Sequence, residues 1–251
     1  MKLVQGRSAY LVAAGCLSLL VLVVFMYQQR KVGISIETAK ATERRLKELI
    51  DHAESYRIIT DSPVYERYAR VYDRVVEYPN GEKFAYDIWG RNWKTNTFSV
   101  VIIVPYETRT RTMTLIKEYN PAHDRFVYGF PTGMVSASKH KSPLDAARQE
   151  LDEEAELTCN NLIDMLSPSA TNGVPQDKYQ RERIYMYLCV DEEEDENPNE
   201  RDSEEVDLHV ERGVPIREVK ELLLAGTFQS NNMAAAYLAL EVLTKMGYSL
   251  D

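Results

Sequence analysis

Residues 130–157 read FPTGMVSASKHKSPLDAARQELDEEAEL, a glycine turn followed by an amphipathic helix. Ser142 has the side chain of a helix cap, Pro143 suits the first helical position, and Asp145 completes a capping box. Apolar side chains then recur at helical spacing and form the stripe expected to face a sheet: Leu144, Ala147, Leu151 and Ala155.

Glu150, Glu153 and Glu154 lie three and four residues apart, so they project from one face of this helix. Five acids fall between residues 150 and 156, although like charges at this spacing destabilise a helix. A divalent cation would relieve the repulsion, and Mg²⁺ prefers carboxylate oxygens while keeping water and phosphate ligands. A solvated helix face is the alternative interpretation.

The chain beyond residue 57 mixes short β-type runs with helices. Pro79-Asn80-Gly81 is a strong turn signal between two such runs and predicts a hairpin. Strands are predicted at 69–78, 83–89, 98–106, 112–118, 184–190 and 205–211, and further helices at 216–224 and 231–245. Residues 191–205 hold ten acids and one arginine, which indicates a solvated, mobile loop. The alternative is a loop that supplies a metal-binding or general-base carboxylate.

Residues 8–28 carry no charge and match the length of a transmembrane helix, with Lys and Arg on both sides. A helical spacer at 32–56 and one domain at 57–250 are expected to follow. The whole chain has a net charge of −9. Its first 31 residues carry basic and no acidic side chains, so the remaining chain is more negative than that. Such a body would repel phosphate backbones, so nucleic acid is not an expected partner.

The three cysteines suggest neither a disulfide framework nor a zinc site. Cys16 lies in the apolar run, and Cys159 and Cys189 are far apart with no CxxC or HxxxH pattern nearby. This usage favours a reducing compartment weakly.

The turn and helix together resemble the box G-x5-E-x7-R-E-U-x-E-E-x-G-U of the Nudix hydrolase superfamily, where U is a bulky aliphatic residue. Residues 149–154 align with R-E-U-x-E-E, and Leu157 aligns with the final aliphatic position. The resemblance extends over roughly residues 58–248 to ADP-ribose pyrophosphatases. It is carried there by RVVEYPNGEKFAYDIW (74–89), TLIKEYNPAHD (114–124), FPTG (130–133) and LSPSATNGVPQDKYQRERIYMYLC (166–189).

This resemblance implies an α/β fold, a Nudix α/β/α sandwich with a mixed sheet. The implied reaction is hydrolysis, with Mg²⁺ or Mn²⁺, of a nucleoside diphosphate-linked compound such as ADP-ribose or a nucleotide sugar. Glu150 and Glu154 would hold metal with the backbone carbonyl of Thr132. Glu153 would complete the metal and water network, and Glu182 or an acid of the 191–205 loop would be the base.

Three aromatic residues, Tyr119, Phe126 and Tyr128, are candidates for stacking on the substrate base, with strand or core packing as the alternative. Departures from the family pattern concern the box itself. Its glutamate falls on Lys141 and its arginine on Gln149, so the ion pair that braces the loop in the family would be lost.

Further departures are Glu156 at the terminal glycine and a loop two residues longer than the pattern. The rival hypothesis is therefore a catalytically inactive accessory subunit of a membrane assembly. The other expected partners are the substrate, a membrane and possible second copies of the chain.

Overall fold

The computed structural model describes residues 40, 41, 44, 45, 56–67, 69–91, 99–166, 173–201, 203 and 205–250. The chain divides into two compact units, Met1–Arg57 with Glu77–Glu82, and Ile58–Val76 with Lys83–Asp251. The membrane span predicted at 8–28 lies outside the described residues. Among those that are described, no helix is long and apolar enough to cross a membrane.

In the first unit, the predicted spacer at 32–56 is described at five positions, of which 40, 41, 44 and 45 are helical. The predicted hairpin turn is present. The Gly81 N–H donates to the Tyr78 carbonyl at 2.9 Å, and Gly81 has φ of 84°, a value that favours glycine. The Arg57 guanidinium donates to the Glu77 carboxylate at 3.0 Å.

A three-stranded sheet consists of β1 (Arg57–Glu66), β2 (Ala69–Glu77) and β3 (Lys83–Arg91), in that order. β2 and β3 lie where the sequence predicts them. β1 is not predicted, because Pro63 interrupts its pattern, and proline is tolerated at the edge position that β1 occupies.

The main sheet is mixed. Its path runs β10 (Val174–Pro175), β11 (Arg183–Val190), β4 (Ser99–Glu107), β5 (Thr112–Asn120) and β13 (His209–Pro215). β6 (Arg125–Gly129) pairs with β5, β7 (Thr132–Met134) with β4, and β9 (Leu162–Asp164) with β11. β11 runs parallel to β4, with Tyr185 opposite Val101. The pairings of β9 and β10 with β11, of β5 and β7 with β4, and of β6 and β13 with β5 are antiparallel.

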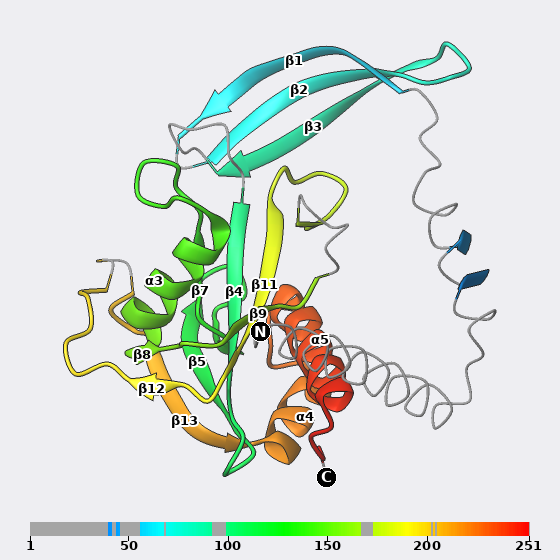
Figure 1. Cartoon of the computed structure of the whole chain (residues 1–251). Coiled ribbons are helices and arrows are strands. Elements are labelled where there is room, and N and C mark those ends of the chain that lie inside the picture. The colour runs from blue at the N-terminus through cyan, green and yellow to red at the C-terminus, as the bar shows by residue number, and fades with distance from the viewer. Residues whose placement is uncertain are drawn as a thin grey trace, which may run out of the picture. The chain divides into compact units, whose positions relative to one another are not determined.

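Helices cover both faces of this sheet (Figure 1). Val101 and Ile103 of β4 pack with the apolar stripe of α3 (Pro143–Ala155). Ile102 and Val104 point to the opposite face, which α4 (Ile216–Leu224) and α5 (Ser230–Met246) cover. The period-2 alternation of a buried strand thus supplies two cores, and the predicted α/β/α arrangement is confirmed.

One expectation is partly right and another is wrong. Most described residues between 191 and 205 are exposed, as a solvated loop predicts. The segment is nevertheless docked, since β12 (Glu193–Glu194) pairs with β8 (Leu157–Thr158) and the Asp195 N–H donates to the Glu156 carbonyl at 3.0 Å. The charge count did not account for these backbone hydrogen bonds. Cys159 and Cys189 form a disulfide, because β11 and the segment after α3 bring their Cα atoms to 6.0 Å.

Candidate active site

Gly133, predicted in a turn, lies in strand β7, which packs directly on the acidic helix. A Cβ built on Gly133 would lie 1.8 Å from Cδ of Glu150, so no other residue fits without displacing that carboxylate. One residue earlier, the Thr132 N–H donates to Oε2 of Glu154 at 2.8 Å. The sequence predicted the carbonyl of Thr132 as a metal ligand, whereas its N–H is the group that contacts Glu154. β7 therefore holds two of the predicted carboxylates in place.

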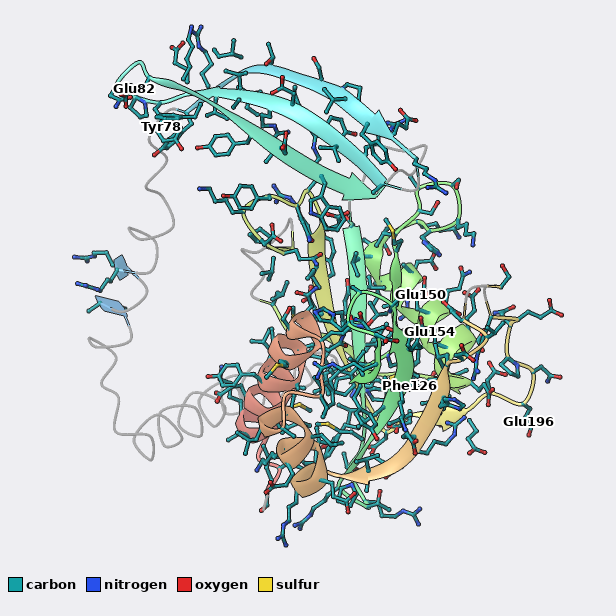
Figure 2. All side chains as sticks on the ribbon, turned by 180° about the vertical axis from the view of Figure 1, so that it is seen from behind. Tyr78, Glu82, Phe126, Glu150, Glu154 and Glu196 are labelled. Atoms are coloured by element: carbon teal, nitrogen blue, oxygen red, sulfur yellow. A yellow bond between two sulfur atoms is a disulfide. The ribbon has the colours of Figure 1, made fainter. Side chains whose placement is uncertain are left out.

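Glu154 is the buried member of the acidic face, with 5% of its surface exposed. Burial raises the pKa of its carboxyl well above the ordinary value, and the charge of Glu150 raises it further. The hydrogen bond from Thr132 acts in the opposite direction and lowers this pKa. Charge on Glu154 is thus unfavourable in the folded chain unless a cation neutralises it. Figure 2 shows both carboxylates projecting from α3.

Gln149, at the position of the box arginine, contacts Glu153 and His140. Its amide donates to Oε1 of Glu153 at 2.6 Å, and its Oε1 lies 3.0 Å from Nε2 of His140. The expected partner, Lys141, has an exposed side chain, and its backbone N–H donates to Asp145. The side chain that contacts Gln149 is that of His140, one residue before Lys141.

The C-terminal end of α3 replaces the family glycine with an ion-paired glutamate. Glu156 adopts a left-handed conformation with φ of 56°, which is unfavourable for a residue with a Cβ. Arg201 reaches its carboxylate at 3.1 Å and Arg212 at 3.3 Å. The same guanidinium groups donate to the Glu153 and Ala155 carbonyls, which the helix leaves without intrahelical partners.

The docked acidic segment brings a further carboxylate toward the site. Arg201 and Asn199 attach the segment to α3, the latter through the carboxylate of Asp152. Glu205, four residues after Arg201, is close enough to raise the pKa of Glu154. Glu118 of β5 does the same. No sequence pattern pointed to Glu118, because it lies in β5 and the glutamates of the acidic face lie on α3.

A pocket of about 480 Å³ lies beside the outer side of α3. It is lined by Asp145, Arg148, Gln149, Asp152, Glu153, Thr158, Asp195 and Asn199. Glu153 is the predicted site residue in this set, so one edge of the acidic face opens to this polar space.

The model of the NUDIX domain family matches residues 96–236, more than half of the chain. The chain belongs to this family. A search of the solved structures finds the crystal structure of an ADP compounds hydrolase, 23% identical, with a TM-score of 0.60, covering 78% of this chain and 98% of that chain. At this identity the likeness shows a shared fold. No curated protein matches the chain.

The predicted membership of the Nudix hydrolase superfamily is thereby confirmed, and it supports the prediction of a pyrophosphohydrolase. Nudix enzymes use divalent metal ions such as Mg²⁺. Within the described ranges, no group of three or more His, Cys, Asp or Glu side chains is gathered closely enough to hold a metal. Mg²⁺ needs only one or two carboxylates, since water and phosphate complete its shell. The hard oxygens of Glu150 and Glu154 fit that requirement.

The remaining predicted residues of this Nudix domain come from parts of the chain other than α3. Glu182 precedes β11 and is 2% exposed, and its carbonyl accepts the Gln176 N–H. Tyr119 and Phe126 form an exposed edge-to-face pair with centroids 5.9 Å apart. Tyr128 stacks on Phe228 in the core beneath α4 and α5, on the face opposite α3. Tyr119 therefore pairs with Phe126, whereas Tyr128 pairs with Phe228.

Proposed function

We propose that this chain is a membrane-anchored Nudix hydrolase that cleaves the pyrophosphate of ADP-ribose or a related nucleoside diphosphate sugar with Mg²⁺ or Mn²⁺. The observation that carries the proposal is the packing of β7 on α3, where Gly133 meets Glu150 and the Thr132 N–H binds Glu154. The family match and the likeness to a solved ADP compounds hydrolase support the type of reaction. The charge-free run at 8–28 supports the anchor.

The proposed roles follow from burial and charge. Glu150 and Glu154 hold the metal beside the carbonyl of Thr132, because their mutual repulsion is relieved by a cation. The bound metal supplies charge neutralisation at the pyrophosphate and activates water. Glu153 orients that water from the edge of the acidic face that opens to the pocket.

The general base is proposed to come from the docked acidic segment. Glu205 acts electrostatically on Glu154, so its carboxylate is near the reacting region. Glu182 is the second candidate, although it is buried at the start of β11. Single Gln variants at the two positions distinguish them. A general base works only when it is deprotonated, so activity falls at low pH, and removal of the true base should remove this dependence of the residual activity on pH. Tyr119, Phe126 and Tyr128 remain proposed base-stacking residues, and the exposed pair Tyr119 and Phe126 is favoured because Tyr128 packs on Phe228.

Activity is tested on the full-length chain in detergent with ADP-ribose and Mg²⁺. Glu150→Gln/Glu154→Gln should lower kcat/KM by about 100-fold or more, because the metal contributes several kcal/mol to the transition state. Glu241→Gln, an exposed carboxylate on α5, is the matched control and should retain activity. Equal activity in the two variants would refute the assignment of the metal site.

Metal binding is tested separately by thermal unfolding. A ligand at a hundredfold excess over Kd stabilises the folded state by about 2.7 kcal/mol. Mg²⁺ or Mn²⁺ should then raise Tm by several degrees in the wild type and have no such effect in Glu150→Gln/Glu154→Gln. A variant with Glu193, Glu194 and Glu196 changed to Gln controls for cations bound by the acidic segment.

The second candidate is an inactive Nudix-like subunit of a membrane assembly. Gln149 and His140 favour it, because a neutral pair replaces the ion pair of the family box. A Tm that does not change with metal, together with no hydrolysis of any nucleoside diphosphate compound, would support the hypothesis of an inactive subunit. Hydrolysis that requires Glu150 and Glu154 would exclude it.

A further inference from the structure

A chain of hydrogen bonds connects the loop before α3 to Glu153. The Ser136 N–H donates to Nδ1 of His140 at 3.0 Å, and Nε2 of His140 lies 3.0 Å from Oε1 of Gln149. The Gln149 amide then donates to Oε1 of Glu153 at 2.6 Å. His140 is 7% exposed, and its own N–H donates to the Ser136 carbonyl at 2.7 Å. The imidazole is therefore fixed at both ring nitrogens and at the backbone.

The direction of this chain is determined by its first bond. Because Nδ1 of His140 accepts an N–H, the neutral imidazole carries its proton on Nε2. That proton faces the carbonyl oxygen of Gln149, so the amide nitrogen must face Glu153. The opposite amide orientation would place an oxygen against the Glu153 carboxylate and an N–H against an N–H.

The chain orients a carboxylate without adding charge. Glu153 is only partly buried, so its side chain would otherwise sample several rotamers. An arginine at position 149 would hold it too, but would cancel one negative charge of the acidic face. His140 and Gln149 are both neutral in this arrangement, so the face keeps its full attraction for a cation.

We propose that His140 and Gln149 are positioning residues that hold the Glu153 carboxylate in its working orientation through this neutral hydrogen-bonded chain. The inference rests on the proposed function, because orientation of Glu153 affects turnover only if Glu153 takes part in hydrolysis. It assigns to His140, a loop residue at a position that the family pattern leaves open, the bracing role that an ion pair fills in the family.

Kinetics of the full-length chain with ADP-ribose and Mg²⁺ test the proposal. His140→Ala and Gln149→Ala should each lower kcat roughly 10–100-fold, as changes to partners of metal-site residues do, with KM little changed. The kcat of the double variant should be no lower than that of the more impaired single variant, since either change breaks the same chain of hydrogen bonds. Lys141→Ala is the matched control, because this side chain is adjacent and exposed, and it should leave kcat unchanged.

A conservative variant separates positioning from packing. His140→Gln places an amide N–H where Nε2 of the imidazole lies, whereas His140→Asn places its amide near Nδ1. The first should recover much of the kcat lost in His140→Ala, and the second should not. Losses that multiply in the double variant, or equal kcat in the Gln and Asn variants, would overturn the proposal.

Nuclear magnetic resonance gives a readout that does not need activity. In the full-length chain labelled with ¹⁵N-histidine, the His140 signals, assigned by their loss in His140→Asn, should show an unprotonated Nδ1 and a protonated Nε2. Gln149→Ala should shift Nε2, while Lys141→Ala should not. A protonated Nδ1 would refute the chain. If the wild type shows no turnover, the proposed function fails while this measurement still tests the hydrogen bonds.

Discussion

The disulfide between Cys159 and Cys189 should contribute a measurable share of the stability of the Nudix domain. It links the segment after α3 to β11 across a sequence separation of 30 residues, and the two residues are 9% and 0% exposed. Closing a loop of that length reduces the entropy of the unfolded chain by an amount worth about 3.6 kcal/mol. For a chain of this size that corresponds to a fall in Tm of roughly 7–14 °C on reduction.

The assay is thermal unfolding of the full-length protein in detergent, with and without a reductant. Cys159→Ala/Cys189→Ala is the reference, since its Tm should be low and insensitive to the reductant. Alkylation of native membranes before and after reduction, followed by mass spectrometry, reports whether the two thiols are linked in the cell. Equal Tm values with and without reductant, or full alkylation before reduction, would refute the reasoning.

The outcome also bears on the compartment. Disulfides persist in oxidising compartments and are rare in the cytosol. A linked pair in native membranes would place the domain on the oxidising side of its membrane, contrary to the weak preference that cysteine usage alone suggested. It would then give the proposed anchor an orientation, which its balanced basic flanks do not provide.

Three further predictions concern the carboxylates and the N-terminus. The raised pKa of Glu154 means that the folded state holds this proton more tightly than the unfolded chain does. Without metal, the free energy of unfolding should therefore fall as pH rises above the ordinary pKa of a glutamate. The fall should be at most about 1.4 kcal/mol per pH unit. Urea titrations in a chelator should show this loss in the wild type relative to Glu154→Gln; parallel pH curves would contradict it. Glu156→Gly should be more stable than Glu156→Ala by about 1 kcal/mol in the same assay, because only alanine retains the cost of the left-handed backbone. Equal stabilities would mean that the turn relaxes. Finally, alkaline carbonate extraction should leave the full-length protein in the membrane pellet because of residues 8–28, and its release would exclude the anchor.

Local patterns accounted for α3 and for most of the longer strands, but not for β1 or β6. Ser142 accepts the Asp145 N–H at 3.1 Å and Pro143 opens α3, as the capping box predicts. The spacing of Glu150, Glu153 and Glu154 placed them on one helix, and the alternation of β4 produced the two cores. Caps and periodicities act within one or two turns of the chain, so they can be read directly from the order of residues.

Contacts between distant residues were decided by tertiary packing. The sequence contained Gly133 and Glu150 but not their packing, in which a Cβ on Gly133 would displace the Glu150 carboxylate. Lys141 was expected to meet Gln149, and the loop turned His140 toward it instead.

The same holds for Glu156 with Arg201 and for Cys159 with Cys189, which are 45 and 30 residues apart. Each of these pairs is brought together by the sheet and by the path of the docked acidic segment. Residue spacing sets which side chains share a face of one element, whereas the energy of burying several elements together selects which faces meet.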